Sequence, residues 1–261
     1  MKIACVQMDV RLGEPETNLS RLKGFVTSAA ADGADVVVLP ETWNVGFFPR
    51  EDLAGLADPD GSLVKRELGA LAAGARVNLV AGSAATIRDG KVYNTAYVFD
   101  RQGECVAQYD KTHLFSPSGE HEFFTPGDST CVFTLDGVKC GLIICYDVRF
   151  PELTRTLALE GIDVLFIPAE WPDVRRMHWQ TLTRARAIEN QIFLACCNGC
   201  GTAGETRYGG ASAIYDPWGT ALAEAEGEET VISAECDLSV IGEIRRNMHV
   251  FADRRPELYH Y

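Results

Sequence analysis

Three residues of complementary chemistry each follow a segment that predicts a buried strand. Cys145 ends the apolar, β-branched run Val138–Ile144, Glu41 ends a similar run that starts at Ala34, and Lys111 follows a third strand-like segment. Sites in α/β proteins are built at the carboxyl ends of strands, so these side chains are expected to meet. A thiol, a carboxylate and an amine in equivalent positions favour nucleophilic catalysis over three unrelated core or surface residues.

Cys145 is predicted to lie at a turn between a strand and a helix. The residues that follow lead into a predicted helix with Pro151 near its first turn. A thiol close to a helix N-terminus is expected to be favoured as the thiolate by the helix dipole. The alternative is a small buried hydrophobe that ends a core strand, which is the commoner fate of a cysteine.

Strands and helices alternate along the whole chain. Strand-like runs cover residues 2–9, 35–40, 77–84, 92–99, 104–109, 131–135, 138–145, 163–168, 192–198, 211–215 and 230–236, and helical patterns cover 17–32, 62–75, 151–160, 174–190 and 238–247. Many of these strands are too apolar to face water, so stacked layers with helices outside are expected. The segment 35–41 is echoed by 163–170, which suggests two similar β–α halves.

Composition narrows the class of protein. The chain has 261 residues without a linker-like or low-complexity segment, which favours one domain over residues 1–261. Its net charge of −13 argues against binding to nucleic acid or to anionic membranes, because both need a basic face. No apolar run reaches membrane-spanning length, and the N-terminus lacks a signal-peptide layout.

The nine cysteines have no spacing typical of a disulfide framework. Their odd number and apolar surroundings favour a reducing cytoplasm. Cys197 and Cys200 have the spacing of a zinc motif and Cys196 adds a third thiol, but no second pair supplies the fourth ligand that structural zinc needs. The segment is therefore interpreted as a core strand that runs into a loop, without metal.

Five motifs together carry a resemblance to a known family. The chain resembles the nitrilase or carbon–nitrogen hydrolase superfamily over nearly its whole length. The matching segments, in family order, are Leu39–Glu41, Tyr109–Phe115, Gly119–Gly127, Cys145–Glu152 and Ala185–Gln191.

The resemblance implies a four-layer α-β-β-α sandwich that pairs as a homodimer or higher homo-oligomer through helices beside the site. It also implies a hydrolase that cleaves a small-molecule amide without a metal or organic cofactor. In that chemistry Cys145 attacks the amide, Glu41 serves as general base and acid, and Lys111 stabilises the oxyanion together with the backbone N–H of Tyr146.

A second glutamate is implied between the lysine and the cysteine. In this superfamily it orients the lysine or the attacking water; counting back from Phe123 selects Glu120, with Glu122 as the runner-up. A solvated acidic loop is the alternative. His113 invites comparison with a Cys–His pair but has no local signature of one, and His178 is interpreted as a structural residue of its helix.

The motifs around the cysteine are most similar to omega-amidases, which deaminate amides of 2-oxo dicarboxylic acids such as 2-oxoglutaramate. Trp171 and Arg175 follow the strand 163–168 and are expected to bind substrate, with Arg175 holding a carboxylate distal to the amide. A solvent-facing arginine is the alternative. Glu170 departs from the family segment, which has asparagine or a small residue more often at that position.

Three other functions stay open at the level of the sequence. Deaminated-glutathione amidases and N-carbamoyl amidohydrolases are close competitors in the same superfamily. A non-catalytic thiol sensor or binding protein with the same fold is the competitor from a different class. Such a protein has no physical need to keep Glu41, Lys111 and Cys145 together.

Overall fold

The strands in the middle of the molecule are apolar on both faces because each sheet is covered on both sides. In the computed structural model, which describes residues 1–259, Ile3 and Cys5 of β1 (Lys2–Gln7) lie in one hydrophobic core. Ala4 and Val6 of the same strand lie in a second core. Successive side chains of a strand point to opposite faces, so one short strand contributes to both cores.

Two sheets stack face to face. The first has the strand order β15-β1-β2-β4-β5-β6 with β3 paired to β4, and the second has the order β14-β13-β10-β9-β8-β7. The strands of the first sheet are β15 (Thr230–Glu235), β1, β2 (Val36–Val38), β4 (Asn78–Arg88), β5 (Lys91–Phe99), β6 (Cys105–Asp110) and β3 (Asp58–Pro59). The strands of the second are β14 (Ala221–Glu224), β13 (Ala213–Tyr215), β10 (Phe193–Asn198), β9 (Val164–Ala169), β8 (Val138–Leu142) and β7 (Val132–Leu135).

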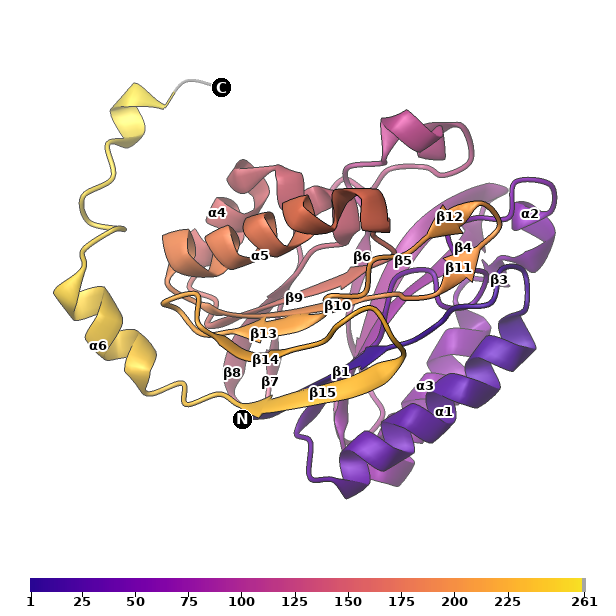
Figure 1. Ribbon diagram of the computed structural model, residues 1–261, viewed down its shortest axis with the longest axis horizontal. Coiled ribbons are helices and arrows are strands. Elements are labelled where there is room, and N and C mark those ends of the chain that lie inside the picture. The colour runs from indigo at the N-terminus through magenta and orange to yellow at the C-terminus, as the bar shows by residue number, and fades with distance from the viewer. Residues whose placement is uncertain (260–261) are drawn as a thin grey trace.

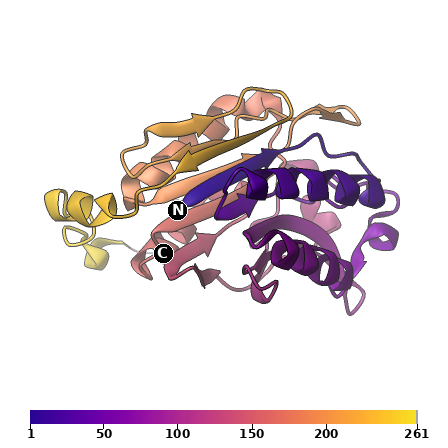
Figure 2. The ribbon, with the colours of Figure 1, turned by 90° about the horizontal axis from the view of Figure 1, so that it is seen from below.

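Helices form the two outer layers. Helices α1 (Pro15–Ala31) and α3 (Ser62–Ala75) cover the first sheet, and α4 (Pro151–Leu159) and α5 (Arg176–Asn190) cover the second (Figure 1; Figure 2). The result is the predicted α-β-β-α sandwich. The remaining elements are α2 (Leu53–Leu56), α6 (Val240–Asn247), the ribbon β11 (Thr202–Ala203) with β12 (Thr206–Arg207), and the short 3₁₀ helices η1 (Ser116–Ser118), η2 (Glu120–Glu122), η3 (Cys145–Arg149), η4 (Asp173–Arg175) and η5 (Pro256–Leu258).

The echo between residues 35–41 and 163–170 corresponds to two similar halves. Strand β2 lies between β1 and β4, and β9 lies between β8 and β10, with parallel pairing in all four cases. Each half is thus a β-α-β-α-β unit with a parallel centre. The carboxyl ends of the two central strands, β2 and β9, lie next to each other. The backbone N–H of Glu41, after β2, is 3.4 Å from the carbonyl oxygen of Ala169 at the end of β9.

Several predicted boundaries differ from the observed ones. The strand that was expected to reach Cys145 ends at Leu142, and the helix expected over 174–190 begins at Arg176 after a separate 3₁₀ turn. Helix α3 matches its predicted range, whereas α2, β3, β11, β12 and β14 were not predicted. These missed elements have four residues or fewer, too few to show a hydrophobic period.

None of the helices described over residues 1–259 combines the length and the apolar character needed to cross a lipid bilayer. Beyond the second sheet, α6 and the segment after it run along the outside of the sandwich (Figure 1). The extent of the domain over residues 1–261 stays a prediction.

Candidate active site

Cys145 is presented by a strained turn between β8 and α4. It opens η3 with a φ of 46°, in the left-handed region that non-glycine residues seldom adopt. The residue is 6% exposed, and Pro151 then starts α4. A strained backbone at a buried thiol is typical of a functional position held in place by its surroundings.

Glu41 is carried to the same place by the segment that follows β2. It can lie there because β4 passes very close to the chain just before it. A Cβ at Gly82 would lie 2.0 Å from the carbonyl oxygen of Pro40, and Gly82 has a φ of 58°. Glycine is therefore required at this crossing.

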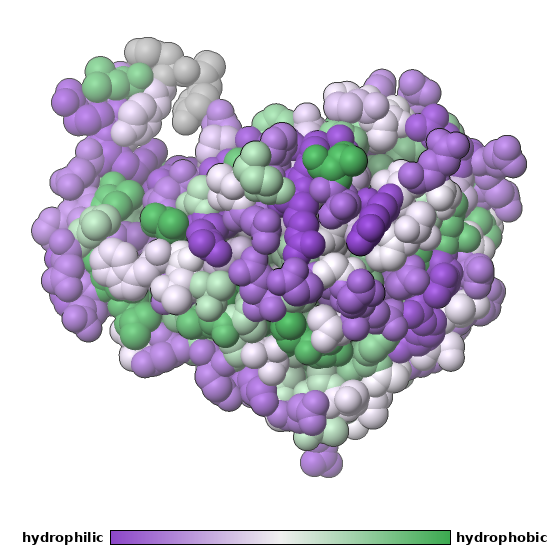
Figure 3. Space-filling model, in the orientation of Figure 1, coloured by the Kyte–Doolittle hydropathy of each residue, from purple (hydrophilic) through white to green (hydrophobic). Residues whose placement is uncertain are grey.

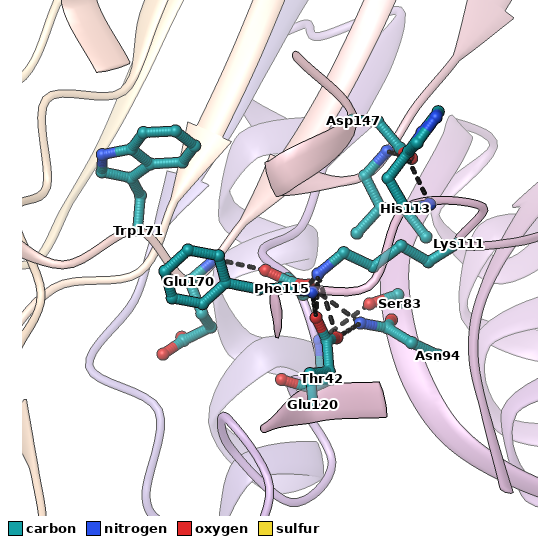
Figure 4. A network of polar contacts seen from close by, with 12 residues as sticks. Thr42, Ser83, Asn94, Lys111, His113, Phe115, Glu120, Asp147, Glu170 and Trp171 are labelled. Carbon is teal, nitrogen blue, oxygen red and sulfur yellow. Dashed lines mark hydrogen bonds and ion pairs between the residues drawn. The ribbon is translucent and has the colours of Figure 1, made fainter. Parts of the chain in front are cut away.

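The Glu41 carboxylate is fully buried and accepts three hydrogen bonds. Its Oε1 accepts from Lys111 Nζ at 2.8 Å and from Asn94 Nδ2 at 2.8 Å, and its Oε2 accepts from the backbone N–H of Glu170 at 2.8 Å. Lys111 and Glu170 follow strands β6 and β9, whereas Asn94 lies within β5. Together the three hydrogen bonds fix the carboxylate in a single orientation. Figure 4 shows the donor side chains of Lys111 and Asn94 close to each other.

Lys111 lies between two acids. Its Nζ is 2.8 Å from Glu41 Oε1 and 3.0 Å from both carboxylate oxygens of Glu120. All three side chains are fully buried. Phe115 also donates its backbone N–H to Glu120, which ties this acid to the loop after Lys111.

Burial and charge set the protonation of this cluster. Burial alone would lower the pKa of Lys111, but the charges of Glu120 and Glu41 outweigh it and hold the pKa well above its ordinary value. Burial and the charge of Glu41 raise the pKa of Glu120 against the pull of Lys111. The ammonium is thus maintained, and one acid of the cluster is biased toward its neutral form.

The Cys145 thiol differs from the expectation of a thiolate favoured by a helix dipole. Burial and the nearby charge of Glu41 raise its pKa well above the ordinary value, and Lys111 offsets only part of the shift. The short 3₁₀ turn η3 supplies less dipole than an α-helix would. These influences favour the thiol over the thiolate, the direction opposite to that expected from a helix dipole.

Asp147 braces the Cys145 turn against the segment that carries Lys111. Its fully buried carboxylate accepts hydrogen bonds from the hydroxyl of Tyr109 at 2.9 Å and the backbone N–H of His113 at 3.0 Å. It also accepts from the backbone N–H of Ile144 at 2.9 Å. One side chain thereby links the Cys145 turn to the segment that carries Lys111.

A small cavity adjoins Cys145. It is lined by Phe47, Phe115, Cys145, Tyr146, Arg149, Glu170, Trp171, Pro172 and Arg175. Trp171 is anchored through its indole N–H to the carbonyl oxygen of Arg175 at 2.8 Å. The Arg175 guanidinium lies 5.0 Å from the ring centre of Phe115 and that of Arg149 lies 4.8 Å from the ring centre of Trp171.

The two guanidiniums of this cavity form no ion pair with any carboxylate of residues 1–259. Burial and the charge of Arg175 lower the pKa of Arg149. Two cations that repel each other across one cavity are suited to an anionic ligand that would lie between them.

The structure brings most of the predicted site residues together. Glu41, Lys111 and Glu120 form one cluster, and Cys145 is close enough for Glu41 and Lys111 to perturb its pKa. Tyr146, Trp171 and Arg175 line the adjoining cavity.

Other residues weighed from the sequence lie elsewhere. Glu122 is exposed, whereas Glu120 contacts the lysine. The His113 ring stacks on Phe150 at 3.7 Å and bonds Asp147, and His178 is exposed. Within residues 1–259 no group of three histidine, cysteine or acidic side chains is arranged to hold a metal ion.

Sequence reasoning missed the site roles of Asn94, Arg149 and the buried Glu170 carboxyl. Asn94 lies inside the apolar segment 92–99, and a polar residue within a buried strand is a signal that could have found it. Glu170 was noted only as a departure from a family pattern. Burial and the charge of Glu41 raise its pKa well above the ordinary value, and its Oε1 has no partner within residues 1–259.

The fold is a four-layer sandwich in which a buried acid–lysine cluster and a buried thiol lie near the carboxyl ends of strands. Comparison with known proteins identifies the class of enzyme. The family model described as carbon–nitrogen hydrolase matches residues 2–246. The chain therefore belongs to the carbon–nitrogen hydrolase family and is an amidohydrolase.

Relatives with named activities are similar over most of their length. The chain is 43% identical over 260 residues to the 2-oxoglutaramate amidase of Bacillus subtilis, covering 98% of both chains. It is 37% identical over 253 residues to the 2-oxoglutaramate amidase of Paenarthrobacter nicotinovorans, covering 94% of this chain and 85% of that one.

Solved structures have the same fold. A superfamily member from Xanthomonas campestris with an arsenic adduct in its active site superposes with a TM-score of 0.91 at 28% identity, covering 98% of this chain and 97% of that one. A mutant amidase from Nesterenkonia sp. AN1 superposes with a TM-score of 0.87 at 28% identity, covering 99% and 95%. In that structure the acetamide moiety of fluoroacetamide is added covalently at the active-site cysteine.

Proposed function

We propose that this amidohydrolase acts as an omega-amidase, converting 2-oxoglutaramate and water to 2-oxoglutarate and ammonia. The observation that carries the proposal is the presence of two guanidiniums, those of Arg149 and Arg175, in the cavity beside Cys145, neither of them paired with a carboxylate within residues 1–259. A net acidic protein needs such a local donor to hold an anion. The two 2-oxoglutaramate amidases among its relatives support the same substrate.

The proposed first half-reaction forms a thioester. The Cys145 sulfur attacks the amide carbon while Glu41 accepts the thiol proton, which suits a thiol with a raised pKa. The oxyanion is stabilised by the Lys111 ammonium and the backbone N–H of Tyr146. Glu41 then gives its proton to the leaving nitrogen, the C–N bond breaks and ammonia departs.

The second half-reaction reverses these roles. Glu41 takes a proton from water, whose oxygen attacks the thioester carbon. The C–S bond breaks, the proton returns to the Cys145 sulfur and the carboxylic acid product leaves. Glu120 has a supporting role, because its two oxygens at 3.0 Å hold the Lys111 ammonium in position and charged throughout.

Arg175 is proposed as the carboxylate anchor of the substrate, with Trp171 packing beside it. The planar guanidinium can donate two parallel hydrogen bonds to a carboxylate. Trp171 fixes the backbone of Arg175 through its indole N–H. The amide end of the substrate then points to Cys145.

The test is ammonia release from a panel of 2-oxoglutaramate, 2-oxosuccinamate, deaminated glutathione, N-carbamoyl acids, nitriles and an uncharged amide of similar length. The wild type should prefer 2-oxoglutaramate, and Cys145→Ala should release nothing while staying folded. Arg175→Met should raise KM for 2-oxoglutaramate by roughly 10- to 100-fold, the equivalent of one charged hydrogen-bonded pair, and spare the uncharged amide.

Other outcomes of the panel identify the alternatives. A preference for deaminated glutathione or N-carbamoyl acids would assign the chain to those branches. Labelling of Cys145 without ammonia release from any amide would favour a thiol sensor. Equal effects of Arg175→Met on both amides would remove Arg175 as the anchor.

Two further properties are proposed with this function. A homodimer formed through helices beside the site is supported by apolar residues exposed on α5, of which Met177 is 65% and Ile188 is 46% exposed. A reducing cytoplasm is supported by the cysteines, all nine of which are free within residues 1–259.

A further inference from the structure

Asn94 contacts all three residues of the buried cluster, the two carboxylates through its side chain and Lys111 through its backbone. Its Nδ2 donates to Glu41 Oε1 at 2.8 Å and is 3.4 Å from Glu120 Oε1. Its backbone carbonyl oxygen accepts the N–H of Lys111 at 2.9 Å. The side chain is 1% exposed, so water does not share these contacts.

We propose that Asn94 is a positioning residue of the reaction centre, whose amide holds Glu41 and Glu120 apart and in fixed orientation around Lys111. The inference rests on the proposed function of that cluster and adds a residue to it. Figure 4 shows the Asn94 amide directed at the same group of oxygens as the Lys111 ammonium.

The chemistry of a primary amide explains why this side chain suits the position. One nitrogen carries two hydrogens, so it can donate to two carboxylates at once without adding charge. The opposite orientation would direct the Asn94 Oδ1 at two acids and is repulsive. A second ammonium would neutralise Glu41 and weaken it as a base.

The remaining amide oxygen is left without a partner. Asn94 Oδ1 is buried and accepts no hydrogen bond within residues 1–259. An unpartnered buried acceptor is destabilising, and an apolar side chain of similar shape would avoid that loss. The arrangement is therefore better explained by what the N–H groups do for the acids than by folding.

The backbone supplies a rigid platform. Asn94 lies in β5, where it pairs with Ala85 of β4, and its neighbour Thr95 pairs with Asp110 of β6. Strand pairing on both sides prevents Asn94 from shifting. Movements of Glu41 by about an ångström would be sufficient to cost catalysis on the order of a hundredfold.

Asn94→Ala tests the proposal against a matched control, Asn190→Ala. Asn190 on α5 is also fully buried, donates from Nδ2 to the carbonyl oxygen of Arg186 at 3.0 Å and leaves its Oδ1 unpartnered. Both variants should lose comparable thermal stability. Only Asn94→Ala should lower kcat, by roughly 10- to 100-fold, with little change in KM.

The pH profile separates positioning from folding. Loss of a hydrogen bond to ionised Glu41 favours its protonated form, so the acid limb of kcat/KM should move to higher pH in Asn94→Ala and stay in place in Asn190→Ala. If kcat and the limb are unchanged in Asn94→Ala, or if both variants lose kcat in parallel with stability, the proposal is overturned.

A measurement that needs no substrate, the alkylation rate of Cys145, keeps this test independent of the proposed function. The rate at which iodoacetamide alkylates Cys145, followed by mass spectrometry of its peptide, reports on base-assisted loss of the thiol proton. It should fall in Asn94→Ala and not in Asn190→Ala, even if 2-oxoglutaramate proves not to be the substrate. Equal alkylation rates in wild type and Asn94→Ala would overturn the positioning role. Asn94→Ser retains one hydrogen-bond donor and replaces the alanine variant if that variant does not fold. Its kcat and its Cys145 alkylation rate should lie between those of the wild type and those expected for Asn94→Ala.

Discussion

At the scale of single residues, the buried carboxylates of the candidate centre are balanced by fewer positive charges than there are acids. One ammonium serves two buried carboxylates, and the further donors to Glu41 are an amide and a backbone N–H. In a low-dielectric interior such a cluster keeps one acid biased toward its neutral form.

The buried carboxyl of Glu170 makes the stability of the protein depend on pH. Burial and the charges of Glu41 and Asp9 raise its pKa well above 4.5, so the folded protein holds a proton that the unfolded chain releases. The stabilisation from that proton is complete at low pH and is lost as the pH rises from about 4.5 toward the folded pKa.

Glu170→Gln cannot lose this proton. We expect its melting temperature relative to the wild type to increase between pH 4.5 and pH 8, as measured by calorimetry over that range. Exposed Glu104→Gln is the control and should show no such trend. If the difference in melting temperature between Glu170→Gln and the wild type were constant from pH 4.5 to pH 8, a raised pKa of Glu170 would be contradicted.

At the scale of elements, the site depends on a brace between two turns. Asp147, two residues after Cys145, receives hydrogen bonds from the end of β6 and from the loop that follows it. Strand β6 is held by its pairing with β5, whereas the loop after Lys111 and the turn at Cys145 lie outside the sheets. Asp147 therefore links the Cys145 turn directly to the paired segment that carries Lys111.

Asp147→Asn replaces an acceptor by an amide whose N–H₂ faces other donors. Buried donors left unpaired cost about 1–3 kcal/mol, so the melting temperature should fall. Turnover should fall by roughly tenfold or more, since the nucleophile and the lysine lose their common support. The measurements are steady-state kinetics and thermal unfolding of Asp147→Asn, with Asp100→Asn on the surface as the control. If Asp147→Asn behaved like the control and the wild type, the role of Asp147 in linking the two segments would be wrong.

At the scale of the whole molecule, two β-α-β-α-β halves meet so that their strand ends form one site. Glu41 comes from the first half, Cys145 and Trp171 come from the second, and Lys111 comes from the edge of the first sheet. The same stacking leaves the outer face of α5 without a covering layer. Figure 3 shows hydrophobic patches among hydrophilic ones on the face viewed in Figure 1.

A homodimer across α5 predicts a simple change of mass. Met177 and Ile188 lie eleven residues apart on one face of the helix, so two lysines there should disrupt the apolar contact. Sedimentation velocity should give a dimer for wild type and a monomer for the Met177→Lys, Ile188→Lys variant. A monomeric wild type would refute the dimer, and a dimeric variant would place its interface elsewhere.

The sequence alone determined the layers and the positions of the principal site residues. Hydrophobic period is a local property, so the range of α3 and the existence of the central strands could be predicted from it. The placement of Glu41, Lys111 and Cys145 after strands followed from the same signal, and the family resemblance assigned them roles.

Only the tertiary structure decided the contacts between those residues. That Glu120 and not Glu122 faces Lys111, and that Asn94 joins the cluster, depends on how segments tens of residues apart stack. The direction of the Cys145 pKa was wrongly predicted from the helix dipole, because the burial and the neighbouring carboxylate that raise it are created only by folding. Local pattern fixes which elements form, whereas desolvation and charge pairing are sums over long-range neighbours that no single segment contains.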